Sequence, residues 1–323
     1  MGGNGKFDLE YEAIVDGIVE GKVIPFLGAG VNLCDRPGDA VWEPDKSAFL
    51  PNGAELAAHL AKRFSYPLPD RDLARVSQFV VELRGPAPLY ARLRQLLSVP
   101  PQINDAHRFL ARLPAKLRAK KAPSPNLLVV TTNYDDCVEA AFAQAGEPLE
   151  VVSYVADTSE ERRNERGKFV HHLASGKRRL IERPNEYREV SVVKTCVLLK
   201  IHGALDRAVA DNDSFVITED HYIDFLTRTD LSNLVPVMLA AQLRASHFLF
   251  LGYSLRDWNL RVILQRIWEE QRLGYNSWAV QKDSDALDRR FWGRRNVEIL
   301  ETDLDEFFAS VDEGLDAVAE GAA

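Results

Sequence analysis

Short apolar runs recur along the chain, and a glycine or a group of polar residues follows each of them within three residues. The runs are Val23–Leu27, Leu127–Val130, Val197–Leu199 and His247–Leu251. Continuous apolar runs of this length are typical of strands buried on both faces of a parallel sheet. Trp278–Val280 and Val297–Leu300 predict two further strands.

Between these runs the apolar residues follow helical spacing, so strands and helices alternate. Asn52 suits an N-cap, and several helices without an intervening strand are expected from there to about Arg112. The pattern therefore predicts an α/β fold in which a parallel sheet carries an inserted, mainly helical smaller lobe. Other helices are expected over Tyr11–Glu20, Val138–Ala145, Asp220–Leu226, Leu234–Ala245, Leu260–Trp268 and Leu304–Val311.

Two long segments show neither the apolar runs of buried strands nor the helical spacing of apolar residues. Proline and glycine punctuate Cys34–Pro51, which we expect to be an irregular loop able to cover a ligand like a lid. Ala156–Glu189 is rich in charge and is interpreted as a surface insertion without catalytic residues. Its His171–His172 pair is expected in a loop, because no third metal ligand lies at helical spacing. His107, near Asn104 at a helix start, is expected to pack or to cap.

The first apolar run ends in Gly28-Ala29-Gly30, followed by Val31 and Asn32. Glycines there can take positive φ and let successive N–H groups point at a pyrophosphate. A full dinucleotide fingerprint needs a third glycine, but Leu33 stands at that place, so the motif is half of the pattern. The alternative is an ordinary tight turn between a strand and a loop.

Polar side chains gather where two later strands end. Thr132, Asn133 and Asp135 follow one strand, and His202 follows another. Ligands bind at the carboxyl edge of open α/β sheets, so these residues are candidates for chemistry. Asp135 equally suits a helix cap, and His202 equally suits a structural histidine bonded to a neighbouring backbone.

Composition and charge narrow the function classes. The net charge of −8 argues against nonspecific binding to nucleic acid over the whole surface. Cys34, Cys137 and Cys196 lie far apart in the sequence, which excludes a four-cysteine zinc site within the chain, and no metal is expected. No apolar stretch approaches the roughly 20 residues that span a bilayer, so we expect a cytoplasmic protein with reduced thiols and no membrane contact.

Four motifs in this order closely resemble the sirtuin-like family, in particular its bacterial antiphage-defence branch. They are Gly28-Ala29-Gly30, Thr131-Thr132-Asn133-Tyr134-Asp135, His202-Gly203 and Gly252-Tyr253-Ser254. The resemblance implies a Rossmann-like parallel sheet and NAD+ as ligand. By the same resemblance the Gly28 turn holds the pyrophosphate, Ser254 holds a ribose, and Asn133, Asp135 and His202 surround the nicotinamide ribose.

Protein-deacylating sirtuins carry a four-cysteine zinc module and a Pro-Asp-Phe-Arg stretch after the glycine turn, and this sequence has neither. The resemblance therefore favours NAD+ hydrolysis, with Asn133, His202 and Asp135 as catalytic residues. The cofactor-binding residues are expected to be Gly28, Ala29, Gly30, Val31, Asn32, Thr132, Gly252, Tyr253 and Ser254. The alternatives are an NAD-dependent deacylase or ADP-ribosyltransferase, and a non-catalytic module that senses NAD or ADP-ribose.

We expect one sirtuin-like domain over residues 1–323. Its Rossmann-like core is placed at about 7–34, 125–155 and 190–318, its helical lobe at about 52–115, and the charged insertion at about 156–189. An unregulated NAD hydrolase would drain its own cell, so control by assembly is expected. The candidate partners are further copies of the chain, as a homo-oligomer, and a second defence protein such as an ATPase.

Overall fold

The computed structural model describes residues 4–69, 72–100, 102–157, 160–227, 235–253, 261–262, 264–265 and 276–318. Its strands are β1 (Val23–Leu27), β2 (Leu128–Thr131), β3 (Leu149–Tyr154), β4 (Phe169–His172), β5 (Arg178–Ile181), β6 (Cys196–Lys200), β7 (Gly203–Ala204), β8 (Ser214–Phe215), β9 (His247–Leu251), β10 (Ser277–Gln281) and β11 (Val297–Glu301). Within these ranges nine strands form one sheet in the order β11-β10-β9-β1-β2-β6-β3-β4-β5, and β7 pairs with β8.

The sheet is parallel from β11 to β3. β1 lies between β2 and β9, so the chain builds the sheet first on one side of β1 and later on the other. This reversal is the topological switch point of a Rossmann-like sheet, beside which ligands bind. The predicted α/β fold with a Rossmann-like parallel sheet is confirmed.

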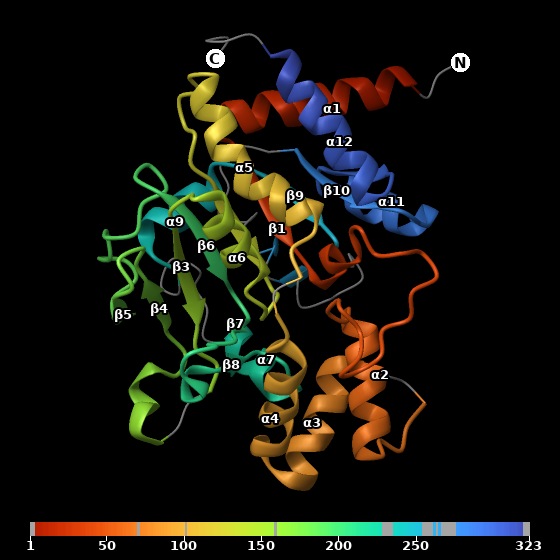
Figure 1. The fold of residues 1–323 in the computed structure, drawn as a ribbon, viewed down its shortest axis with the longest axis vertical. Coiled ribbons are helices and arrows are strands. Elements are labelled where there is room, and N and C mark those ends of the chain that lie inside the picture. The colour runs from red at the N-terminus through yellow and green to blue at the C-terminus, as the bar shows by residue number, and fades with distance from the viewer. Residues whose placement is uncertain are drawn as a thin grey trace.

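Helices cover both faces of this sheet (Figure 1). The helices on the sheet are α1 (Asn4–Val19), α5 (Asp105–Ala119), α6 (Cys137–Ala145), α7 (Glu219–Thr227), α9 (Val237–Arg244), α11 (Ala286–Gly293) and α12 (Leu304–Ala317), and three more helices, α2 (Gly53–Phe64), α3 (Leu73–Arg84) and α4 (Pro86–Leu97), lie outside it. Among the described helices none is long and apolar enough to cross a bilayer.

Successive residues of the central strands enter two different cores, as the alternation of a strand requires. Val23 and Leu27 of β1 belong to the core beneath α1, α5, α6 and α12. Ile24 and Phe26 belong to the core on the other face, together with residues of α7, α9 and α11. α1 and α12 pack against each other at the top of Figure 1.

The smaller lobe consists of α2, α3 and α4, which lie at the lower end of the molecule in Figure 1. Leu60, Val80 and Leu93 are fully buried in a third core that these helices share with Phe215 of β8. Most of α5 falls inside the expected lobe of residues 52–115, but its Phe109 packs on Phe308 of α12 with ring centroids 5.0 Å apart. α5 therefore covers the sheet, and its apolar stripe alone could not tell these two surroundings apart.

The interpretation of Ala156–Glu189 as a surface insertion is wrong for its middle part. β4 and β5 lie there and extend the sheet antiparallel beyond β3. Phe169 and Ile181 are fully buried in the core that contains Ile24 and Phe26 of β1. Exposed arginines on β5 are typical of an edge strand, whose charges discourage pairing with other chains, and they hid the strand in the sequence.

His171 was also placed wrongly, since it lies in β4 and is completely buried rather than in a loop. Its Nδ1 lies 2.8 Å from the Tyr187 hydroxyl and its Nε2 lies 3.0 Å from Glu150 Oε2. Both ring nitrogens therefore have protein partners, which explains a buried histidine without a metal.

Candidate active site

An open cleft of about 1040 Å³ follows the carboxyl edge of the sheet. The segments after β1, β2, β6, β9, β10 and β11 line one side, and the Cys34–Pro51 loop with the start of α2 lines the other. This volume suits a ligand of nucleotide or dinucleotide size, and the position beside the switch point is the expected one. The expected irregular loop is confirmed, because Cys34–Pro51 contains no helix or strand.

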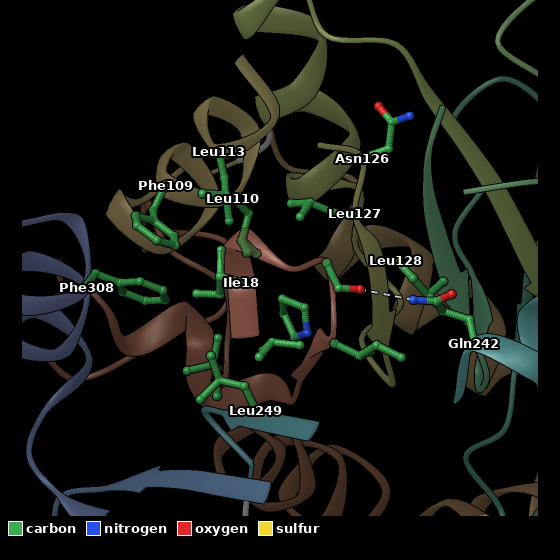
Figure 2. Close-up of a pocket in the computed structure, with 15 residues that line it drawn as sticks. Ile18, Phe109, Leu110, Leu113, Asn126, Leu127, Leu128, Gln242, Leu249 and Phe308 are labelled. Atoms are coloured by element: carbon green, nitrogen blue, oxygen red, sulfur yellow. Dashed lines mark hydrogen bonds between the residues drawn. The ribbon is translucent and has the colours of Figure 1, made fainter. Parts of the chain in front are cut away.

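Figure 2 shows a second cavity, located toward the amino ends of the strands. Its volume is about 10 Å³, which is room for about one water molecule. Apolar side chains such as Ile18, Phe109 and Leu113 surround it, and Gln242 Nε2 donates to the Gly21 carbonyl 3.2 Å away. We therefore assign it to core packing and not to ligand binding.

The glycine turn after β1 is present, but its glycines serve backbone packing. Gly28 has φ −110° and ψ 174°, and Gly30 also lacks a positive φ, so the expected positive φ is wrong. A Cβ on Gly28 would lie 2.6 Å from the Tyr253 ring. A Cβ on Gly30 would lie 2.6 Å from the Gly252 carbonyl oxygen. The turns after β1 and β9 thus approach too closely for a side chain.

Most N–H groups of this turn already have protein acceptors. Gly28 donates to the Leu251 carbonyl at 3.0 Å, and Gly30 donates to the Gly252 carbonyl at 2.7 Å. Val31 donates back to the Gly28 carbonyl, and its side chain is buried in the core. The prediction that successive N–H groups point at a pyrophosphate is therefore wrong for these three residues, although Gly28, Ala29 and Gly30 do line the cleft.

Gly252 is the residue of this junction that needs its glycine for two reasons. Its φ is +62°, a conformation that L side chains rarely adopt. A Cβ there would also lie 1.9 Å from the Val31 nitrogen. Gly252 and Tyr253 line the cleft, as does Thr132, whereas Ser254 lies outside the described residues.

Asn133 lies in the cleft and is held firmly. Its N–H donates to Thr131 Oγ1 at 3.0 Å, and its side-chain Nδ2 donates to the Gly28 carbonyl at 3.2 Å. The amide is therefore fixed between the ends of β1 and β2. Its side chain is largely buried, so its orientation does not depend on solvent.

Asp135 lies beside the start of α6 and also lines the cleft. Its Oδ1 accepts from the N–H of Cys137, the first residue of α6, at 3.1 Å, whereas Asp136 holds the N-cap position. Its Oδ2 lies 3.5 Å from Asn32 Nδ2, and both residues line the cleft. Asn32 Oδ1 is buried without a hydrogen-bond partner, so it is an acceptor that a ligand can satisfy.

His202 lies two residues after the end of β6 and is almost fully buried while lining the cleft. Tyr222 and Phe225 of α7 pack edge-on against its ring, with centroids 5.3 and 5.8 Å away. Its Nε2 has no hydrogen-bond partner. Burial among these rings lowers the pKa of His202 to about 3, so the imidazole is neutral at physiological pH.

The lid-like loop is tied to α2 through Arg36. The guanidinium donates to both carboxylate oxygens of Glu55, at 3.0 and 2.6 Å, and to the Ala40 carbonyl at 2.8 Å. It also lies over the Phe49 ring, 4.1 Å from the centroid. Glu55 completes the capping box of α2 with Asn52, so the loop and the lobe share one network at the cleft wall.

Lys200 was not predicted as a functional residue, although a signal existed. It is a lone charge inside the apolar run that ends in His202. In the structure it is fully buried and its Nζ donates to the carbonyl oxygen of Asp135 and to Glu139 Oε1. A lysine that is fully excluded from solvent in a central strand of a sheet is rare in proteins.

Among the described residues, Cys34, Asp35 and Asp305 bring three potential metal ligands within 4.8 Å of one another. The Cys34 thiol donates to Asp305 Oδ1 at 2.8 Å, and burial together with this carboxylate raises the thiol pKa. Asp35 Oδ2 accepts from the Asp105 N–H and from Arg108. These groups satisfy each other as they stand, and zinc would require the thiolate that this setting disfavours.

A family described as the SIR2-like domain matches residues 127–300, which is more than half of the chain. The chain belongs to the SIR2-like family. The expected sirtuin-like resemblance is thereby confirmed. The matched range holds Asn133, Asp135, His202 and Gly252, so the cleft residues after β2, β6 and β9 of this SIR2-like protein all fall within the family region.

Several curated proteins are similar to this SIR2-like chain. "NAD(+) hydrolase ThsA" of Acinetobacter baumannii (strain 532279) is 27% identical over 270 residues, covering 81% of this chain and 43% of that protein. "Defense-associated sirtuin 2" of Bacillus subtilis is 22% identical over 286 residues, covering 88% and 22%. "NAD(+) hydrolase ThsA" of Cytobacillus dafuensis is 25% identical over 242 residues, covering 75% and 37%. The chain thus spans less than half the length of these relatives.

A solved structure of a Sir2 homologue in complex with NAD is similar over 94% of both chains at 14% identity. Its TM-score against this SIR2-like chain is 0.39, too low to support a comparison of the two sites.

Proposed function

We propose that this chain hydrolyses NAD+ to nicotinamide and ADP-ribose. The observation that carries the proposal is the His202 Nε2 atom, which is buried without a partner in the cleft that also holds Asn133 and Asp135. A buried polar atom without a partner costs free energy, so such an atom in a cleft favours a ligand that satisfies it. The unpartnered Asn32 Oδ1 supports the same argument.

The relatives support NAD+ as the substrate. Two of them are named NAD(+) hydrolases, and a third is named a defence-associated sirtuin. These proteins are more than twice as long as the matched region. NAD+ hydrolysis by this chain is therefore our proposal and does not follow from the names of the relatives. We propose the same setting, antiphage defence by NAD+ depletion.

The chemistry requires little from the protein beyond positioning. The bond between ribose C1′ and the nicotinamide nitrogen breaks, and nicotinamide leaves as a neutral molecule with the bonding electrons. Water then bonds to C1′ and releases one proton. Asn133 can hold a ribose hydroxyl or the water without adding charge, because its amide is already oriented by Gly28 and Thr131. Neutral His202 can accept the proton at Nε2.

The test is to incubate the purified chain with NAD+ over a wide range of protein concentration and to identify the products. We expect nicotinamide and ADP-ribose in equal amounts. Because we also propose that assembly controls the activity, turnover per chain should rise with concentration or with an added partner such as a defence ATPase. Turnover per chain that stays constant over that range would contradict control by self-assembly, and a lack of any NAD+ cleavage would contradict the function.

The residue assignment has its own test. Asn133→Ala and His202→Ala should each lower kcat by about 100-fold or more while NAD+ binding measured by calorimetry is largely kept. Asn126→Ala is the matched control, since this half-buried asparagine does not line the cleft and its Nδ2 donates to the Val193 carbonyl. Near wild-type kcat in either cleft variant would remove that residue from the mechanism.

A further inference from the structure

Lys200 is the least expected charged residue in the core. Its side chain is completely buried at the end of β6, two residues before His202. Its Nζ donates to the Asp135 carbonyl at 2.5 Å and to Glu139 Oε1 at 2.8 Å. The residues on the same face of β6, Cys196 and Leu198, are apolar members of the core beneath α6.

This arrangement costs stability. Removing an ammonium from water is expensive, and one carboxylate partner restores only part of that cost. The lysine also lies beside the start of α6 at Cys137, where the helix dipole disfavours a cation. Glu139 gains little from the pair, because its Oε2 is enclosed without a partner and burial raises its pKa. An apolar side chain would fill the same place at lower cost.

The contact with Asp135 connects the lysine to a segment that lines the cleft. The segment 132–136 carries Asn133 and Asp135, and other bonds fix it to its surroundings: Asn133 Nδ2 to Gly28, the Cys137 N–H to Asp135 Oδ1, and the Leu205 N–H to the Tyr134 carbonyl. Lys200 adds a further hydrogen bond, from β6 in the middle of the sheet. This bond joins the end of the strand that precedes His202 to the loop that carries Asn133 and Asp135.

We propose that Lys200 is a positioning residue, which holds the main chain of segment 132–136 in register with His202 through the Asp135 carbonyl. It does not line the cleft, so it acts without touching the substrate. The proposal rests on the proposed function as far as turnover is concerned. Its structural part, the ordering of segment 132–136, can be measured without any nucleotide.

The experiment compares three variants of the whole chain. Glu139→Gln is the matched control, which keeps the lysine and its bond to Asp135. Lys200→Met with Glu139→Gln removes that bond but leaves no unpaired charge in the core. Lys200→Arg keeps both the charge and a donor, and serves as the conservative variant. Melting temperatures confirm that each variant is folded.

We expect the double variant to show amide hydrogen exchange in residues 132–137 at least about tenfold faster than Glu139→Gln, in the absence of nucleotide. We also expect its kcat to fall at least about tenfold while KM stays within about threefold, and Lys200→Arg to recover part of that loss. Unchanged exchange would overturn the proposal, and so would faster exchange with unchanged kcat or a change in KM alone. If the double variant does not fold, the same two measurements are made on Lys200→Arg alone. We then expect smaller changes in the same direction, and unchanged exchange or unchanged kcat would overturn the proposal. If the wild type does not cleave NAD+, the proposed function fails while the exchange measurement still decides the positioning role.

Discussion

His202 and His107 are both buried histidines with an unpartnered Nε2, but their surroundings give them different roles. His107 lies in the first turn of α5, where its Nδ1 accepts from the Asn104 N–H at 3.3 Å and its own N–H donates to Asn104 Oδ1. This capping box confirms the expectation that His107 packs and caps. His202 lacks such a role, and it lines the cleft whereas His107 does not.

The low pKa of His202 predicts an unusual pH profile. A general base works in its neutral form, and burial moves the pKa of this imidazole from 6.5 to about 3. The neutral form therefore persists as the pH falls from about 8 to about 5, and kcat/KM should stay flat over that range. An ordinary histidine would lose activity below its pKa of 6.5.

The measurement is kcat/KM against pH for the free enzyme, with the melting temperature followed in parallel to exclude acid unfolding. An inflection near pH 6.5 that vanishes in His202→Gln would show that the imidazole titrates normally and would contradict this account.

At this scale the sequence could identify the polar residues but not their partners. Asn133, Asp135 and His202 stand out because they follow apolar runs, and strand ends meet at one edge of a parallel sheet. Lys200 carried the same positional signal but interrupts the run itself. Its meaning depends on the Asp135 carbonyl, which lies 65 residues away in the sequence.

At the scale of elements, the site depends on a junction between the turns that follow β1 and β9. The Gly30 N–H donates to the Gly252 carbonyl, and the Gly28 N–H donates to Leu251. The two glycines of the half fingerprint indicated that another group comes close to the backbone of this turn, which is correct. The group that comes close is the turn after β9 of the protein itself. A pattern of glycines cannot say whether a ligand or a neighbouring turn occupies the space they leave.

Gly252→Ala should disrupt this junction. The positive φ costs about 1–2 kcal/mol for alanine, and the contact with the Val31 nitrogen forces the turns apart at a further cost of about 1–3 kcal/mol. We expect the free energy of unfolding, measured in urea, to fall by about 2–5 kcal/mol. Gly293→Ala is the control, because nothing lies within 4 Å of its Cβ position and its φ is not positive. Equal stability of the two variants would show that the junction relaxes freely.

The strands that the sequence missed share a physical cause. The central strands are buried on both faces and form apolar runs in the sequence, whereas β4 and β5 are the last two strands at one end of the sheet, with β5 at its edge. Their apolar pairs, Phe169-Val170 and Leu180-Ile181, are only two residues long and are flanked by polar or charged residues, so the segment resembles a solvated charge run. The boundary of the helical lobe failed for a related reason, since α5 has the same apolar stripe whether it packs on the lobe or on the sheet.

At the scale of the whole molecule, the cleft carries an excess of negative charge. Its lining includes the acidic residues Glu55, Asp135, Asp283, Asp288, Asp303 and Asp305, and the basic residues Arg36 and Lys282. Arg36 is already paired with Glu55. The excess is greatest after β10 and β11, on the side of β1 opposite to Asn133 and His202. If the nicotinamide end of NAD+ binds near His202, as we propose, the adenosine end extends toward this acidic side.

This charge distribution predicts a preference for NAD+ over NADP+. The 2′-phosphate of NADP+ adds about 1.5 to 2 negative charges to the adenosine ribose, next to carboxylates that repel it. We expect kcat/KM for NADP+ to be at least about tenfold lower, a difference of about 1.4 kcal/mol, and the gap to narrow at high salt. Asp283→Asn should also narrow the difference in kcat/KM, because it removes one of the negative charges that line the cleft, next to Lys282. Glu313→Gln makes the same change of charge on the exposed side of α12, outside the cleft, and should leave the ratio unaltered. Equal kcat/KM for the two dinucleotides at low salt would mean that the adenosine end does not lie against the acidic side of the cleft.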